Sequence, residues 1–165
     1  MPKVVYPLLQ VLQIKKRRVE DAERVVLEKR NLLKQEEDKL KQREKERDKV
    51  RNHHESKLKQ MREEMDGGTT SPKILQMKAY IKVVQENLKT EEKKVNDQKE
   101  QVKIAERNLD QAIQELKFRR LEVDKLMTHK HDWEKEVRKE EEIIEGREQD
   151  EIGSVVYMMH RKTRS

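Results

Sequence analysis

The sequence predicts an all-α protein in which two long helices form an antiparallel coiled-coil hairpin. Of 165 residues, 45% are charged, 32% are hydrophobic and 3% are aromatic, a composition typical of long solvent-exposed helices. Apolar residues recur at every seventh position over long stretches, which is the spacing of a coiled coil. Glycine and proline are absent from residues 8–66 and 73–145, so two long helices are expected.

The first helix is expected at about residues 7–66. Its apolar residues follow one heptad seam, while the companion positions that would widen this seam are mostly Lys and Glu. The helix can therefore bury only a narrow stripe. The heptad residues are Leu12, Val19, Val26, Leu33 and Leu40.

The turn is expected at residues 66–72. Gly67 and Gly68 permit the positive φ angles that a tight reversal of the chain needs. Ser71 can cap the following helix, and Pro72 suits the first turn of that helix.

The second helix is expected at about residues 72–152, followed by a basic C-terminal tail at 153–165. An apolar seam runs along this helix at every seventh position, with a weaker companion seam three residues later. Both helices, the turn and the tail are expected to form one elongated domain over residues 1–165. The main seam consists of Ile74, Ile81, Leu88, Val95, Val102, Leu109, Leu116, Val123, Val137 and Ile144, with Lys130 as its polar exception.

A tight turn determines which residues face each other, because residues paired across a hairpin centred near Gly68 have numbers that total about 137. This register places Glu36 near Gln98. It also places Arg47 near Glu91, so charged residues meet polar residues instead of hydrocarbon. We therefore expect a monomer or weak self-association, with a parallel homodimer of extended chains and a higher assembly of hairpins as the alternatives.

Packing is expected to be uneven along the second helix. Val95 is flanked by Glu91 and Gln98, whereas Leu109 and Leu116 lie where both seams are apolar or small. Substitution by alanine should therefore cost less stability at Val95 than at Leu109 or Leu116.

The two helices are expected to end unevenly, which creates an open end. The register places Pro7 opposite Lys130, so residues from about 131 onward extend beyond the first helix. The apolar residues of this extension, including Trp133, could be covered by the N-terminal segment 4–6 or by another protein. We favour another protein, because Trp is enriched at the centres of protein interfaces.

Basic residues gather near the same end of the predicted hairpin. A solvated helix face or an acidic protein partner would explain them, and so would the phosphates of a nucleic acid. Nucleic acid is disfavoured, because aromatic stacking residues are nearly absent and acidic residues are interspersed along both helices. We call these residues the basic collar: Lys3, Lys15, Lys16, Arg17, Arg18, Lys117, Arg119 and Arg120.

No residue pattern indicates catalysis, a cofactor or a metal site. The chain has no cysteine, which excludes disulfides and thiolate ligands. Its histidines lack the i, i+4 spacing that lets two imidazoles on one helix bind the same metal ion. No apolar run approaches the ~18 residues that span a bilayer, and no secretory signal is recognisable. We expect a soluble, non-enzymatic protein without membrane insertion.

Several short stretches occur in an order that carries a family resemblance. They are YPLLQVLQIKKR at residues 6–17, EDAER at 20–24, YIKVV at 80–84, KFRR at 117–120 and REQDE at 147–151, the last followed by Arg161 and Lys162. In this order they resemble the YscO/FliJ family of stalk proteins from type III secretion and flagellar export. The likeness covers nearly the whole chain.

The resemblance implies a stalk that links the secretion ATPase to the export gate and escorts secretion chaperones or a needle-length regulator. It also implies a location in the bacterial cytoplasm, peripheral to the inner-membrane export apparatus. The family's gate-binding face is similar to Tyr80 and Val84 here, while Asn87 and Glu91 depart from the family's small and basic residues. A nucleic-acid-binding helical hairpin and a generic coiled-coil scaffold are the alternative functions.

Two regions are therefore expected to bind partners. The open end is predicted from its charge and its apolar residues, and the face around Tyr80 is predicted from the resemblance. The predicted partner-binding residues are Leu8, Leu12, Arg17, Arg18, Tyr80, Val84, Arg119, Arg120 and Trp133.

Overall fold

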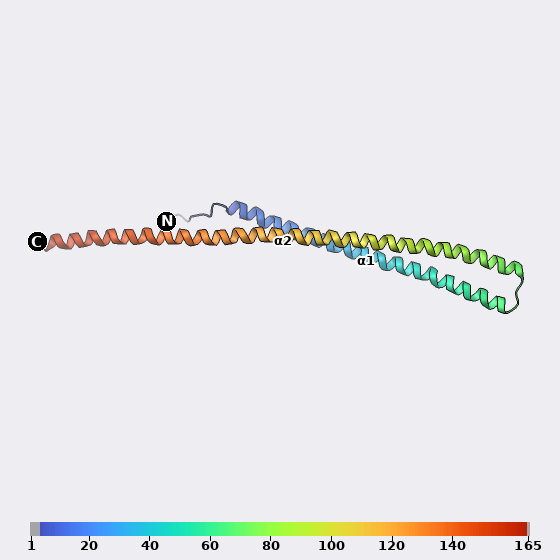
Figure 1. Ribbon diagram of the computed structural model, residues 1–165. Coiled ribbons are helices and arrows are strands. Elements are labelled where there is room, and N and C mark those ends of the chain that lie inside the picture. The colour runs from blue at the N-terminus through green and yellow to red at the C-terminus, as the bar shows by residue number, and fades with distance from the viewer. Residues whose placement is uncertain (1–3, 165) are drawn as a thin grey trace. The chain divides into compact units, whose positions relative to one another are not determined.

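The computed structural model describes residues 4–164, which contain two helices, α1 (Leu9–Asp66) and α2 (Ser71–Thr163), joined by a short turn (Figure 1). This confirms the predicted all-α hairpin of two long helices. Lys3 of the basic collar and Ser165 of the predicted tail lie outside the described residues.

The contacts within the chain fall into two units, and each unit contains parts of both helices. Unit 1 comprises Met1–Ala22 and Leu116–Ser165, and unit 2 comprises Glu23–Glu115, which includes the turn. The single elongated domain over residues 1–165 stays a prediction.

Unit 2 is held together by the predicted heptad seam. Its buried residues in α2 occupy both main-seam and companion positions, as knobs-into-holes packing requires. Val95 is only 1% exposed, whereas Leu109 is half-buried, so the burial of these residues does not support the expected weak packing at Val95. The buried residues of this unit are Val26, Ile81, Val84, Val95, Val102, Ala105 and Ala112.

A polar layer lies next to Val95 along the seam. Gln98 Nε2 donates a hydrogen bond to the backbone oxygen of Glu36, 2.9 Å away, and another to the Glu36 carboxylate. The hydrogen bond from Gln98 holds the pKa of Glu36 below its ordinary value. The predicted pairing of Glu36 with Gln98 is confirmed, and the two polar side chains satisfy each other next to the apolar seam.

The second predicted polar layer is built differently. Arg47 forms its ion pair within α1, and Glu91 pairs with Lys94 of its own helix at 3.3 Å. The cation that crosses from α1 to α2 is Arg51, which lies 3.8 Å from Glu92. The physical reason is distance. An oppositely charged residue on the same helix is close enough to compete for the ion pair with one on the other helix.

The C-terminus of α1 is a Schellman motif, which requires a residue in the left-handed conformation after the helix. Gly68 supplies this conformation with a φ of +81°. The Gly68 amide donates to the Met65 carbonyl at 3.4 Å, and the Thr69 amide donates to the Glu64 carbonyl at 3.3 Å. The prediction that the turn uses glycine at positive φ is confirmed at Gly68.

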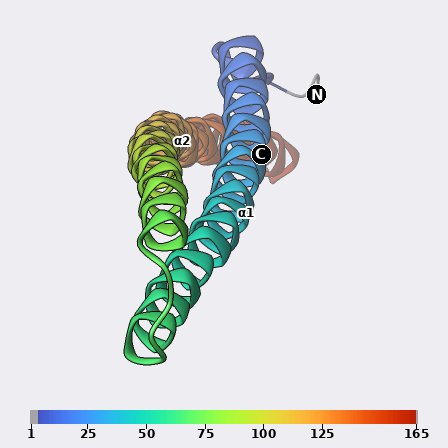
Figure 2. The same ribbon diagram turned by 90° about the vertical axis from the view of Figure 1, so that its right-hand side faces the viewer.

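The loop is shorter than predicted, because helix covers both ends of residues 66–72 (Figure 2). The Thr70 carbonyl accepts the first hydrogen bond of α2 from the Ile74 amide at 3.2 Å. Thr70 is therefore the N-cap, and Ser71 is the first helical residue. Pro72 lies in the first turn, where a missing N–H removes no helical hydrogen bond.

In unit 1 the first part of α1 packs against the second part of α2. Lys15 Nζ lies 3.1 Å from a carboxylate oxygen of Glu122, and this pair follows the predicted register. The hairpin register that starts at the turn therefore also describes the pairing in unit 1. The buried residues of this unit are Tyr6, Leu12, Ala22 and Leu116.

Helix α2 continues to Thr163, although the helix was predicted to end near residue 152 and the tail to begin at Gly153. Glycine costs about 1 kcal/mol in a helix relative to alanine, but it keeps its backbone hydrogen bonds. Three basic residues in the last turn also interact favourably with the helix dipole. Over residues 4–164, no helix is both long enough and apolar enough to cross a bilayer.

Gly68→Ala should destabilise the protein by about 1 kcal/mol, because a φ of +81° is strained for any residue with a Cβ atom. Gly67→Ala is the matched control, since Gly67 lacks a positive φ and an added Cβ would lie 3.4 Å from the Glu63 carbonyl oxygen. Urea unfolding followed by circular dichroism measures both losses. Equal losses would contradict the special role of Gly68.

Candidate protein-docking surfaces

Three aromatic side chains meet where the N-terminal segment lies on α2. The Tyr6 ring contacts the rings of Trp133 and His129, with centroids 5.4 Å and 5.7 Å apart. The Tyr6 hydroxyl also hydrogen-bonds His129 Nδ1, and Tyr6 is only 4% exposed. Edge-to-face ring pairs are favourable beyond the area that they bury. Tyr6 of the same chain therefore covers part of Trp133, which the sequence analysis assigned to another protein. Trp133 stays half-buried, and its role in partner binding stays a prediction.

The local sequence explains how Tyr6 reaches α2. The Leu9 amide donates to the Tyr6 carbonyl at 3.1 Å, and this turn precedes the first residues of α1. Figure 1 shows the short segment before α1 beside α2. An open groove of about 450 Å³ lies next to the aromatic cluster. Besides Tyr6, Leu9 and Trp133, it is lined by Val4, Val5, Lys130, Glu134, Val137, Arg138 and Glu141.

Glu122 lies between two members of the basic collar. Its carboxylate is 3.1 Å from Lys15 and 3.3 Å from Arg119, so cations of α1 and α2 converge here as the register predicted. The hydrogen bond from Lys15, with a smaller contribution from Arg119, holds the pKa of Glu122 below its ordinary value. Glu122 thus offsets part of the collar's charge, while Arg17 and Arg18 are exposed.

An exposed stripe on α1 contains two residues that the sequence analysis missed. Val11 and Ile14 are exposed, and together with Leu8, which immediately precedes the helix, they are spaced by three residues along the chain. Arg18 follows Ile14 by four residues, which places it on the same side of the helix. We call Leu8, Val11, Ile14 and Arg18 the apolar–basic stripe. The three-residue spacing beside the buried seam is the signal that could have revealed it.

Two of the predicted docking residues lie in the core. Leu12 is 1% exposed and Val84 is 4% exposed, because both occupy seam positions between the helices. A partner could touch them only if the helices separated. Of the predicted docking residues on α2, Arg119 is half-buried and Arg120 is exposed, and both interact with other residues of the chain.

Tyr80 lies at the edge of the seam in unit 2 and is 47% exposed. Its hydroxyl and His53 Nε2 are hydrogen-bonded at 2.7 Å. The Lys57 ammonium lies 5.7 Å from the centre of the Tyr80 ring, within reach of a cation–π interaction. These two residues of α1 hold the exposed ring in one orientation.

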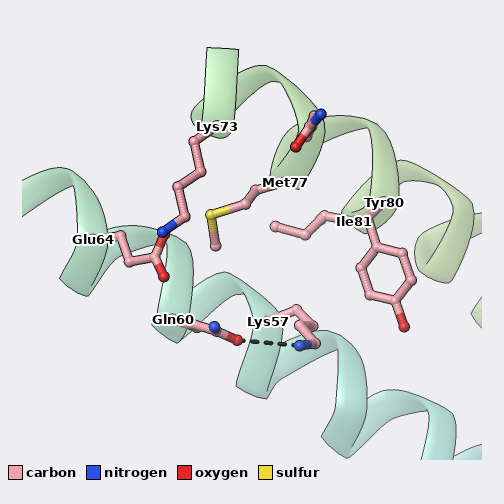
Figure 3. Close-up of a pocket in the computed structure, with 8 residues that line it drawn as sticks. Lys57, Gln60, Glu64, Lys73, Met77, Tyr80 and Ile81 are labelled. Carbon is pink, nitrogen blue, oxygen red and sulfur yellow. Dashed lines mark hydrogen bonds and ion pairs between the residues drawn. The ribbon is translucent and has the colours of Figure 1, made fainter. Parts of the chain in front are cut away.

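A pocket of about 260 Å³ opens beside Tyr80, between the two helices of unit 2. Figure 3 shows Met77 and Ile81 pointing into it from α2, with Glu64 and Lys73 at one end. The Glu64 carboxylate and the Lys73 ammonium are 3.9 Å apart. The pocket therefore combines an apolar floor with a charged rim. Lys57, Gln60 and Gln76 complete its lining.

The described surfaces offer contacts for other proteins. Within residues 4–164, no group of three or more histidine, aspartate or glutamate side chains is arranged to hold a metal ion. Exposed apolar side chains lie beside charged ones in both units, a combination suited to protein interfaces. The fold and these surfaces define a coiled-coil interaction protein.

Comparisons with known proteins identify the family. The family model described as YscO-like protein matches residues 3–163. A solved structure described as a YscO homologue, CT670 from Chlamydia trachomatis, is 53% identical, covers 97% of this chain and 99% of that chain, and has a TM-score of 0.91. A chain in the solved complex of the CdsV and CdsO proteins of Chlamydia pneumoniae is 52% identical, over 51% of this chain and 98% of that chain, with a TM-score of 0.49. Among curated proteins, no match was found.

This chain belongs to the YscO-like family, which confirms the resemblance seen in the sequence. It is therefore a component of a type III secretion system. The family consists of secretion components that are generally non-enzymatic.

Tyr6→Ala should shift the fluorescence emission of Trp133 to longer wavelength, because removal of the phenol exposes the half-buried indole to water. Trp133 is the only tryptophan of the chain, so the emission reports this contact directly. Tyr157→Ala is the control, since Tyr157 is exposed elsewhere on α2. An unchanged emission maximum in Tyr6→Ala would show that the rings do not pack in solution.

The lowered pKa of Glu122 predicts a pH dependence of stability. A carboxylate whose pKa is lower in the folded state stabilises the fold above its unfolded pKa, and this contribution is lost as the pH falls through the folded pKa. Glu122→Gln should therefore lower the melting temperature at neutral pH and reduce the loss of stability below about pH 4.5. Glu136→Gln, at an exposed position, should keep the wild-type profile. Thermal melts across this pH range would contradict the assignment if the two variants behaved alike.

Proposed function

We propose that this protein is a non-enzymatic stalk that links the secretion ATPase to the export gate of a bacterial type III secretion system. One observation carries the proposal: each unit presents an exposed apolar and charged surface, the apolar–basic stripe in unit 1 and the Tyr80 pocket in unit 2. A linking protein needs two such surfaces. The protein acts in the cytoplasm, at the periphery of the inner-membrane export apparatus.

The apolar–basic stripe is the docking surface for the secretion ATPase. Its apolar side chains are already exposed, so a partner buries them without unfolding any part of the hairpin, at about 25 cal/mol of stabilisation per Å². Arg17 and Arg18 are exposed at the end of the stripe, where they can steer an acidic surface toward it. Glu122 offsets Lys15 across the helix pair and does not reduce this role of the two arginines.

The Tyr80 pocket is the docking surface for the export gate. The hydrogen bond to His53 and the contact with Lys57 fix the ring before binding, which reduces the entropy that a partner must overcome. Met77 and Ile81 provide a place for an apolar side chain of the gate protein. Val84 supports this surface from the core.

Secretion chaperones or a needle-length regulator would be escorted on a further exposed face. Phe118 and Leu121 are exposed on α2 and are three residues apart, so they share one side of the helix. Neither residue takes part in the buried seam. Cargo could therefore bind and leave while the two helices stay paired.

Combined charge reversal by Arg17→Glu and Arg18→Glu should slow association with purified secretion ATPase by about tenfold at low salt and flatten its salt dependence. Val11→Ala with Ile14→Ala should mainly speed dissociation, because apolar contacts hold the complex after encounter. Biolayer interferometry separates the two rates. Lys59→Glu with Arg62→Glu is the matched control, since it makes the same change in net charge at exposed positions near the turn.

The assignment of the two surfaces is tested with the same variants. Tyr80→Ala should weaken binding to the purified export gate protein and leave ATPase binding unchanged. If the control pair impairs ATPase binding as strongly as the Arg17 and Arg18 pair does, the apolar–basic stripe is not the docking surface. If none of the variants changes binding to either protein, the stalk proposal fails.

A further inference from the structure

Helix α2 continues beyond the start of α1, so part of its seam has no described residue of α1 opposite it (Figure 1). Val137 and Ile144 continue the heptad seam there, and Ile144 is 48% exposed. Acidic residues surround them, since residues 140–151 contain seven acidic residues and one basic residue. Glu148 and Glu151 follow Ile144 by four and seven residues, which places them on the same side of the helix. We call Val137, Ile144, Glu148 and Glu151 the apolar–acidic face.

The charge of this face limits what can cover it. Its carboxylates repel the phosphates of lipids and nucleic acids, so a matching partner is a protein surface that combines apolar and basic side chains. The apolar–basic stripe of the same chain is such a surface. Val11 and Ile14 are exposed in it, and residues 8–18 contain four basic residues and no acidic one.

The two surfaces also match in spacing. Arg18 follows Val11 by seven residues, and Glu151 follows Ile144 by seven residues. Seven residues make two helical turns, so helices that run in the same direction can bring Val11 to Ile144 and Arg18 to Glu151 at once. Within one chain α1 and α2 are antiparallel and the register places Val11 opposite Leu126, about 27 Å along α2 from Ile144. The match can therefore form only between two copies of the chain.

We propose that two copies of this chain form a weak antiparallel dimer, in which the apolar–basic stripe of each copy packs on the apolar–acidic face of the other. A two-fold axis makes the two contacts equivalent. Each α1 is antiparallel to its own α2. An antiparallel pair of α2 helices therefore sets each α1 parallel to the α2 of the other copy, as the spacing requires.

The groove beside the aromatic cluster lies where the two-fold axis would pass. The pairing of Val11 with Ile144 brings Leu126 of one α2 beside Ile144 of the other, so the axis crosses α2 midway, at about residue 135. The part of α2 that lines the groove extends from Lys130 to Glu141, with the same midpoint. In the dimer the two grooves face each other. The exposed residues Val4 and Val5, which also line the groove, then become covered by the other copy.

The dimer should be weak and reversible. Each of its two contacts involves about three turns of two helices, which is less than the interface of a permanent dimer. The apolar–basic stripe is also the proposed docking surface for the secretion ATPase, so the dimer and the ATPase complex would exclude each other. That consequence rests on the proposed function. The dimer itself does not, and its test uses the purified chain alone.

Sedimentation equilibrium of the full chain tests the proposal through its charges. At protein concentrations from about 5 to about 200 μM, the wild type should show a monomer–dimer equilibrium that weakens about tenfold between about 0.05 M and about 0.5 M NaCl. Arg18→Glu and Glu151→Arg should each weaken the dimer by at least about tenfold, because like charges then meet at both contacts. An equimolar mixture of the two variants should restore the dimer, because unlike charges meet at both contacts of a mixed pair.

Arg62→Glu and Glu63→Arg are the matched controls, since they make the same charge changes at exposed positions of α1 near the turn. Each control, alone or mixed with the other, should associate like the wild type, and circular dichroism should show unchanged helicity in every variant. A chain that stays monomeric at the highest concentration would overturn the proposal and leave the apolar–acidic face to another, basic protein. A mixture of Arg18→Glu and Glu151→Arg that associates no better than either variant alone would overturn it as well.

Disulfide trapping tests the pairing directly, because the chain has no cysteine of its own. Val11→Cys with Ile144→Cys should give a covalent dimer on oxidation, since the two positions are too far apart within one chain to be bridged. Val11→Cys with Ile152→Cys is the control, because Ile152 is also exposed but lies about 12 Å further along α2. Equal yields of covalent dimer from the two variants would contradict the proposed alignment.

Discussion

The structure depends on the meeting of two narrow apolar stripes in one register. A pair of helices has no third element to cover its core, so each helix can bury only the side that faces the other. Leu12 in unit 1 and Val95 in unit 2 are the most deeply buried large side chains among the described residues. If one helix shifted by one residue relative to the other, each seam residue would be rotated by about 100° away from the other helix. All the apolar layers would then be lost at once.

Polar contacts reinforce this register. Gln98 reaches the backbone and the carboxylate of Glu36, and Lys15 meets Glu122 across the helices. Contacts of this kind contribute little free energy at an exposed position. Their value lies in specificity, because each is satisfied only when the apolar residues on either side are also aligned.

The same constraint shapes the surfaces that can bind partners. The core uses only one stripe of each helix, so most of the remaining surface is exposed. Apolar residues outside the seam can therefore contact a partner. Val11 and Ile14 on α1 and Tyr80 on α2 are such residues. Leu12 and Val84 are apolar as well, but they are buried in the seam, so hydrophobicity alone did not separate exposed candidate residues from core residues.

The sequence by itself determined the two helices, the turn and the register, because periodicity and helix breakers are local properties. Gly68, the Glu36–Gln98 pair and the heptad residues were all predicted in this way. Only the structure showed which side chain packs on Trp133 and where the second helix ends. Tyr6 packs on Trp133 and the helix continues past Gly153. Neither outcome follows from periodicity, because the first is a contact between distant parts of the chain and the second is a balance of about 1 kcal/mol in helix propensity.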